Sequence, residues 1–301
     1  MTPEFLLQSL APLHHLSNTD TRTLRQLHSG KLKRLSPNYA IDSDVFEQAP
    51  RHLQHWIDIV AKGRDRHEAV AIGRTAARLH GMWVVPLTDE VAEFALPSGH
   101  VPPLKNQAAG TRYRYAALTS DDITIINGAR AVHRVRAFLD IARYHGFAEG
   151  LVAADWLLAT GFTKQTLTTQ LNLLGRVKGV AVARRCIAHA VAKSESPYES
   201  FARALLIEAG IGDLEVQKHV GSRTRVDLCV AGFLIIEVDG ESKYDGATFG
   251  KSTDSVIVAE RKREKWLQNL GYRVLRVSPA DLHRHSASFA ATVRSIVARA
   301  A

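Results

Sequence analysis

Two acidic side chains stand in otherwise apolar segments of the C-terminal third of the chain. Asp227 lies in TRVDLCVA and Glu237 lies in FLIIEVDG. An ionised carboxylate buried in an apolar strand costs several kcal/mol unless a partner compensates it, so each acid should have a cation nearby. The partner is either a divalent metal ion or an arginine. The candidate arginines are Arg225, Arg263 and Arg276.

The spacing of these acids predicts that they lie on one face of a sheet. Side chains alternate along a strand, so Glu237 and Asp239 share a face, and Asp227 shares a face with Arg225 and Cys229. A hairpin that turns at residues 231–232 would place the two strands side by side. We therefore expect Asp227 and Glu237 to approach each other near one end of the sheet.

Carboxylates that are held together repel one another unless they are protonated or bridged by a cation, and a hard divalent metal is the ordinary solution at neutral pH. The expected cofactor is Mg²⁺ or Mn²⁺. A water molecule on such a metal can attack a phosphodiester while the metal offsets the charge on the phosphate. Lys243 follows Asp239 by four residues and could orient that water or stabilise the transition state.

The elements that would position these residues occupy residues 196–301. The pattern there predicts a helix in PYESFARALLIEAGI, strands in LEVQKHV, TRVDLCVA and FLIIEVDG, a helix in DSVIVAERKREKWLQNLG, a strand in YRVLRVS and a final helix near 287–300. Three strands joined by short turns, followed by a helix that crosses to a fourth strand, indicate an α/β sandwich with a mixed sheet. The whole chain is expected to be α+β.

This region resembles the PD-(D/E)XK restriction-endonuclease-like superfamily, and more narrowly the branch related to very-short-patch-repair endonucleases. The segments that carry the resemblance are SPYESFARALL, RVDLCV, IIEVDGESKYD and AERKREKWLQNLGYRVLRVS, in that order. The resemblance implies metal-dependent hydrolysis of nucleic-acid phosphodiester bonds, with Asp227, Glu237 and Glu199 as metal ligands. It also implies that Lys243 is a migrated catalytic lysine and that Glu260 and Arg263 form a supporting helix motif.

One position departs from the superfamily pattern. The lysine usually stands two residues after the glutamate, where this chain has Asp239. Either Lys243 substitutes for it or the site is inactive. Two of the acids also have structural interpretations: Glu199, after Ser196 and Pro197, fits a helix capping box, and Asp239 before Gly240 is a common turn pair.

The first fifty residues predict a second functional surface. LRQLHSGKLKRLSPNYAI indicates a basic helix, a glycine turn and a basic hairpin, the outline of a winged helix-turn-helix DNA-binding module. The alternative is a solvated basic face on a small helical domain. The residues expected to face phosphates are Arg22, Arg25, Lys31, Lys33 and Arg34.

The middle region, residues 51–195, reads as mainly helical with a few strands and shows no constellation of chemical groups. Helices are expected in HEAVAIGRTAARLHGM and RAVHRVRAFLDIARYHG, and strands in VAEFALP and DITIING. The segment AKSESP suggests a boundary, which gives domains at 1–50, 51–195 and 196–301. The N-terminal two-thirds resembles, more loosely, proteins that join an AbiEi-type antitoxin winged helix to a nuclease-like domain.

Composition narrows the class of protein. The formal net charge is +9, and most of the excess lies in residues 1–195, which favours a polyanionic partner, DNA before membrane. Two cysteines are too few for a disulfide framework, and neither a leader nor a membrane-spanning run is evident, so a cytoplasmic location is expected.

Two functions follow from the sequence. The first is a DNA-binding protein with an Mg²⁺-dependent endonuclease-like domain, active in phage defence or DNA repair. The second is a non-catalytic DNA-binding transcriptional regulator or antitoxin whose nuclease domain is degenerate. In either case a cognate toxin or defence protein is a possible partner.

Overall fold

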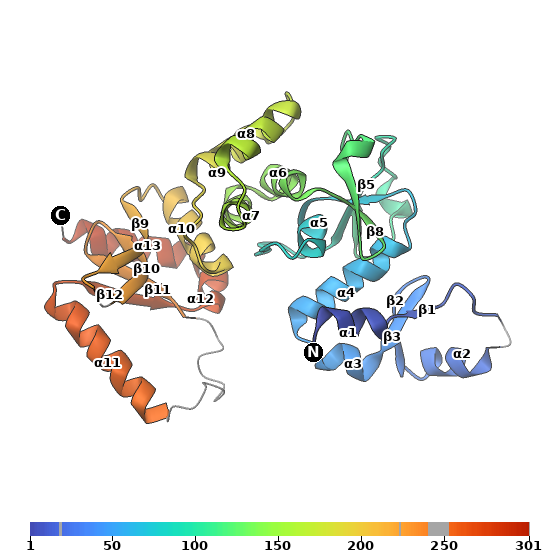
Figure 1. The fold of residues 1–301 in the computed structure, drawn as a ribbon, viewed down its shortest axis with the longest axis horizontal. Coiled ribbons are helices and arrows are strands. Elements are labelled where there is room, and N and C mark those ends of the chain that lie inside the picture. Colours follow the sequence, from blue (N-terminus) through green and yellow to red (C-terminus); the bar gives the residue numbers. More distant parts are fainter. Residues whose placement is uncertain (18–19, 223, 240–252, 301) are drawn as a thin grey trace. The chain divides into compact units, whose positions relative to one another are not determined.

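The computed structural model describes residues 1–17, 20–222, 224–239 and 253–300 (Figure 1). The chain is an α+β protein, as expected. Its residues form two compact units, Met1–Met82 with Thr88–Tyr144, and Trp83–Leu87 with His145–Ala301. In the described part of the chain, no helix is both long enough and apolar enough to span a membrane.

The first unit begins with a small antiparallel sheet and helices packed around it. The elements are α1 (Pro3–Gln8), β1 (Ala11–Pro12), α2 (Thr21–His28), β2 (Leu32–Ser36), β3 (Tyr39–Asp42), α3 (Ser43–Gln48) and α4 (Arg51–Arg64). The strand order is β1-β3-β2, so β2 and β3 form the expected hairpin after helix α2. Buried Leu6, Ile41 and Ile57 supply part of its core.

The same unit contains a five-stranded sheet of order β6-β5-β4-β8-β7. Its elements are β4 (Val70–Ala71), α5 (Gly73–Leu79), β5 (Ala92–Ala95), η1 (Leu104–Asn106), β6 (Thr111–Tyr113), η2 (Ser120–Asp122), β7 (Ile123–Ile126), β8 (Ala129–Val132) and α6 (Arg134–His145).

Two of the predicted helices in this region begin later than expected. In HEAVAIGRTAARLHGM, Val70 and Ala71 form a strand that pairs with β5 and β8, and the helix begins only at Gly73. In RAVHRVRAFLDIARYHG, the first residues belong to β8. In both cases pairing with neighbouring strands overrides the local helical pattern.

The second unit consists of a helical layer and a sheet domain. The helices before the sheet are α7 (Phe147–Ala159), α8 (Lys164–Leu173), α9 (Val180–His189) and α10 (Pro197–Glu208). The sheet domain continues with β9 (Leu214–Val220), β10 (Thr224–Val230), β11 (Leu234–Val238), α11 (Thr253–Asn269), β12 (Arg273–Val277), α12 (Pro279–Arg284) and α13 (Ser286–Ala298).

The sheet of the second unit has the order β12-β11-β10-β9, with β12 parallel to β11 and the other pairs antiparallel. This confirms the predicted mixed sheet. Figure 1 shows α11 on one side of the sheet and α10 on the other. Cys229 and Ile235 pack with Leu267 of α11, while Leu228 and Ile236 alternate with them along the strands.

Candidate functional site

Four polar side chains stand at one level across the C-terminal sheet. In the parallel pair, Glu237 of β11 lies opposite Arg276 of β12. β10 is antiparallel to both β11 and β9. When the two registers are extended to Asp227, this residue lies opposite Glu237 on one side and opposite Gln217 on the other. The order across the four strands is therefore Gln217, Asp227, Glu237, Arg276. We call this set the cross-strand row.

Glu237 is buried, and arginine is its partner. Its side chain is 8% exposed, and both carboxylate oxygens accept hydrogen bonds from Arg263 of α11, with Nη1 at 3.2 Å and Nη2 at 2.5 Å. Arg276 lies 3.8 Å away on the other side. Arg263 also donates to the hydroxyl of Thr224 at 2.8 Å. The sequence left two partners open for Glu237, a divalent metal ion or an arginine, and among the described residues its partner is an arginine.

The neighbouring acids have structural contacts as well. Oδ2 of Asp227 accepts a hydrogen bond from the backbone N–H of Val238 at 2.9 Å, which ties the ends of β10 and β11 together. Asp239 continues the pairing with β12 through its backbone N–H, which donates to the carbonyl of Val277. Its carboxylate lies 4.0 Å from Arg276. The cross-strand row thus combines carboxylates with arginine counter-charges.

Glu199 caps the start of α10, as its sequence context suggested. Ser196 is the N-cap residue, and its hydroxyl accepts from the backbone N–H of Glu199 at 3.1 Å. The return bond differs from a standard capping box, because the Glu199 carboxylate accepts from the N–H of Glu195. The same oxygen, Oε2, accepts from the side-chain amide of Gln217 at 2.8 Å. Glu199 is thereby connected to the cross-strand row through Gln217.

Gln217 is the member of this site that sequence reasoning missed. It is buried in the middle of β9, and its backbone has a left-handed φ of 52°. For a residue with a side chain, this conformation costs about 1–2 kcal/mol and persists only where the surroundings hold it. Nothing in LEVQKHV signals the conformation, because glutamine has no special preference for it.

The described residues do not fit a divalent cation at Glu237. Such a cation needs oxygen ligands that are free to coordinate, and both oxygens of Glu237 are bonded to Arg263. Across the described part of the chain, no group of three or more His, Cys, Asp or Glu side chains could hold a metal ion. Lys243 lies outside the described residues, as does the side chain of Glu260 in α11. Their predicted roles stay predictions.

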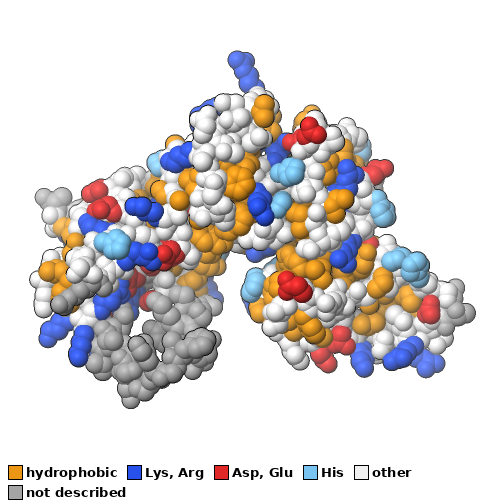
Figure 2. Space-filling view, viewed as in Figure 1, with side chains coloured by type: hydrophobic (Ala, Val, Ile, Leu, Met, Phe, Trp, Pro, Cys, Tyr) orange, Lys and Arg blue, Asp and Glu red, His pale blue; other side chains and the backbone are white. Residues whose placement is uncertain are grey.

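The N-terminal basic residues form a solvent-exposed surface. Arg22 and Arg25 project from α2, a helix that buries none of its side chains. Lys31 lies before β2, and Lys33 and Arg34 lie within it, and all three are exposed. The Nζ of Lys33 lies 4.2 Å from the centre of the Phe46 ring. Figure 2 shows Lys and Arg side chains gathered at the edge of this unit where Figure 1 places α2.

The tip of the hairpin that follows α2 is fixed. The carbonyl of Asn38 accepts from the backbone N–H of Leu13, and the N–H of Asn38 donates to Asp65 at the end of α4. Lys31, Lys33 and Arg34 precede or lie in the first half of β2, so they are at the opposite end of the hairpin, next to α2.

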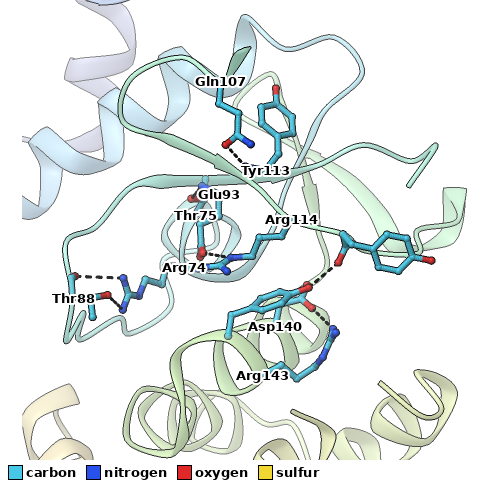
Figure 3. Close-up of polar contacts among 11 residues, drawn as sticks. Arg74, Thr75, Thr88, Glu93, Gln107, Tyr113, Arg114, Asp140 and Arg143 are labelled. Atoms are coloured by element: carbon cyan, nitrogen blue, oxygen red, sulfur yellow. Dashed lines mark hydrogen bonds and ion pairs between the residues drawn. The ribbon is translucent and has the colours of Figure 1, made fainter. Parts of the chain in front are cut away.

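A network of buried charges in the first unit was also missed from the sequence (Figure 3). Glu93 is 1% exposed, and its carboxylate accepts from Nε of Arg114 at 2.7 Å and from the backbone N–H of Arg74. The Arg74 side chain is itself buried and donates to Thr88. Because these groups satisfy one another, we interpret the network as structural.

Asp140 forms a second part of that network. It is fully buried and bonds to Arg143 at 2.9 Å and to Arg136 at 3.3 Å. Burial raises the pKa of its carboxyl, and the two arginines counter that effect. The sequence signal available was RVRAFLDIAR, in which arginines stand four before and three after the aspartate on one helix face.

No protein-family model matches the chain, and comparison with curated proteins gives no match.

Proposed function

We propose that the chain is a DNA-binding regulator or antitoxin that contacts the phosphate backbone through α2 and the start of β2. The observation that carries this proposal is the exposure of all five basic residues on one helix and the strand that follows it. None of the five forms an ion pair with another described residue, so their charge is available to phosphates.

In this proposal the C-terminal sheet domain is nuclease-like in its arrangement but does not cleave phosphodiester bonds. Glu237, the central acid, already has its charge compensated by Arg263 and Arg276. Asp239 stands where a catalytic lysine would be expected. A cytoplasmic location and a toxin or defence protein as partner stay predictions of the sequence.

The test is binding of a fluorescent 20-base-pair duplex, measured by anisotropy at several salt concentrations. Arg22→Glu with Arg25→Glu should weaken binding at least tenfold and reduce the slope of log affinity against log salt by about two, since each phosphate contact contributes about 0.9. Lys105→Glu, a reversal at an exposed lysine of η1 in the same unit, is the matched control. Unchanged binding in the double variant would refute the proposal.

A second candidate function is hydrolysis of phosphodiester bonds at the cross-strand row. The observation that favours it is the register of β10 and β11, which, extended by one pair beyond Leu228–Ile236, brings Asp227 beside Glu237. This function requires Arg263 to leave Glu237.

Incubation of supercoiled plasmid with Mg²⁺ or Mn²⁺ separates the two functions. Nicking that is lost in Asp227→Asn and Glu237→Gln, and kept in the exposed control Asp213→Asn, would establish hydrolysis. Duplex binding without nicking would support the regulator.

A further inference from the structure

A groove runs along the open edge of β9 in the second unit. β9 is the last strand of the described sheet and pairs only with β10 (Figure 1). Six consecutive residues, 214–219, line a cavity of about 700 Å³ together with residues 190–193, Leu158 and Lys164. An adjoining cavity of about 330 Å³ shares Gln217 and His219 with it and extends the groove to Arg225.

The wall opposite β9 is held rigidly by a buried ion pair. Asp155 of α7 is fully buried and accepts two hydrogen bonds from Arg203 of α10, at 2.7 and 2.8 Å. The same carboxylate accepts from the backbone N–H of Val191 and the hydroxyl of Ser194. Arg203 also donates to the carbonyl of His189. These bonds fix the wall segment, residues 190–193.

The wall segment and β9 do not pair with each other. Among the described residues, no backbone hydrogen bond joins 190–193 to 214–219. The groove therefore exposes one row of β9 backbone N–H and C=O groups, beside an apolar lining that includes Leu158, Val191 and Val216. A strand edge beside an apolar surface is the arrangement that accepts an added peptide strand.

The charge at the rim selects the kind of peptide. Lys164 and Lys193 are exposed and form no ion pair with a described residue, although the Nζ of Lys164 donates to the backbone carbonyl of Ala188 at 2.8 Å. The other charged residues of the lining are already paired, Lys218 with Glu215 and Arg225 with Glu195. The groove thus carries uncompensated positive charge at Lys164 and Lys193. None of its lining residues is a Phe, Tyr or Trp that could stack on bases, which disfavours single-stranded nucleic acid.

We propose that this groove binds an extended acidic segment of a partner protein, which adds to the sheet as a strand beside β9. Backbone hydrogen bonds to β9 supply affinity, and alternate apolar side chains of the segment lie against Leu158 and Val191. Acidic residues of the segment pair with Lys164 and Lys193. A segment of six residues is about 20 Å long, comparable to the seven-residue β9.

The test begins with selection of ten-residue peptides from a random display library on the full-length chain. Enriched peptides should alternate β-branched and acidic residues. In fluorescence polarisation their affinity should fall at least tenfold in Lys164→Glu with Lys193→Glu, and stay unchanged in Lys105→Glu. N-methylation of alternate peptide amides should abolish binding for one alternate set only, because only one set faces β9.

Three results would overturn the proposal. The first is that no peptide is enriched. Natural proteins place lysine and irregular backbone on strand edges to block pairing, and that result would show that the edge of β9 is blocked in this way. Enriched peptides that ignore the double reversal would bind elsewhere. The third is that a 12-nucleotide single-stranded DNA binds the chain and that this binding is lost in the same double variant, which would assign the groove to nucleic acid.

Discussion

Arg263 of α11 and Glu237 of β11 form a two-point ion pair, with Nη1 donating to Oε2 and Nη2 donating to Oε1. Because the carboxylate is buried, this pair fixes the helix against the strand and satisfies a charge that would otherwise be costly in the sheet.

Replacement of Arg263 by methionine should destabilise the chain. Removal of one partner from a buried pair costs about 3–5 kcal/mol. We expect about 1–3 kcal/mol here, because the Arg263 side chain is 28% exposed and Arg276 stays near Glu237. Urea denaturation measures the change, and Arg261→Met, an exposed site on the same helix, is the control. Glu237→Gln in the Arg263→Met background should recover part of the loss.

Gln217 offers a test of its left-handed backbone. Gln217→Gly and Gln217→Ala both remove the hydrogen bond to Glu199, so their difference isolates the backbone conformation. Glycine adopts positive φ without a steric cost, so the glycine variant should be about 1 kcal/mol more stable than the alanine variant. Equal stability in denaturant melts would show that residue 217 is not left-handed in solution.

Gly73→Ala should destabilise the first unit strongly. A Cβ at Gly73 would lie 2.6 Å from Oε2 of Glu93, and φ there is +52°. Overpacking and the left-handed cost together give about 2–4 kcal/mol. Gly81→Ala has a similar φ of +70° but open space around the added Cβ, so it should cost only about 1 kcal/mol. Thermal or urea melts that rank the two variants in the opposite order would contradict the observed packing.

Acid should weaken the fold through His80. Burial lowers the pKa of His80 below its usual value near 6.5, and the nearby Arg134 and His133 lower it further. The unfolded chain then binds more protons than the folded chain below pH 6.5, so the free energy of unfolding falls between pH 7.5 and pH 6.0. His80→Gln retains a donor for the Val132 carbonyl and should reduce this pH dependence. Burial likewise lowers the pKa of His283, so part of the dependence should persist.

The two cysteines should be unreactive in the folded protein. Cys186 and Cys229 are both buried, and burial raises the pKa of the Cys186 thiol to about 12. The thiolate is the reactive form, so a chromogenic aromatic disulfide at pH 8 should modify neither cysteine until denaturant is added. Rapid modification without denaturant would place a thiol at the surface.

The C-terminal sheet could be predicted from the sequence because its strands are apolar and alternate cleanly with turns. The segments LEVQKHV, TRVDLCVA, FLIIEVDG and YRVLRVS each form a strand, in the expected mixed arrangement. Short α12 was not predicted, because six residues give too little periodicity. The first unit was harder, since Val70–Ala71 is a strand only because β5 and β8 lie beside it.

The candidate site shows the same division. The expected hairpin at 231–232 placed Asp227 and Glu237 on neighbouring strands, and the register, extended by one pair beyond Leu228–Ile236, sets them side by side. The choice between arginine and metal for Glu237 could not be made from the sequence, because it depends on where α11 places Arg263. Gln217 could not be found because its role comes from a backbone conformation. The groove beside β9 depends on Asp155 and Arg203, which are 48 residues apart in the chain.

The bonds that hold Asn38 from both sides have a thermodynamic consequence for any ligand of the basic surface. A hairpin that is free in solution loses conformational entropy when it docks, and that loss subtracts from affinity. Here Leu13 and Asp65 already restrain the turn. At the other end of the hairpin, Lys33 and Arg34 lie in β2, which is paired with β3, so the backbone that carries them is ordered before association. The backbone positions of these charges are therefore set by folding, so a ligand of this surface would not have to order the hairpin.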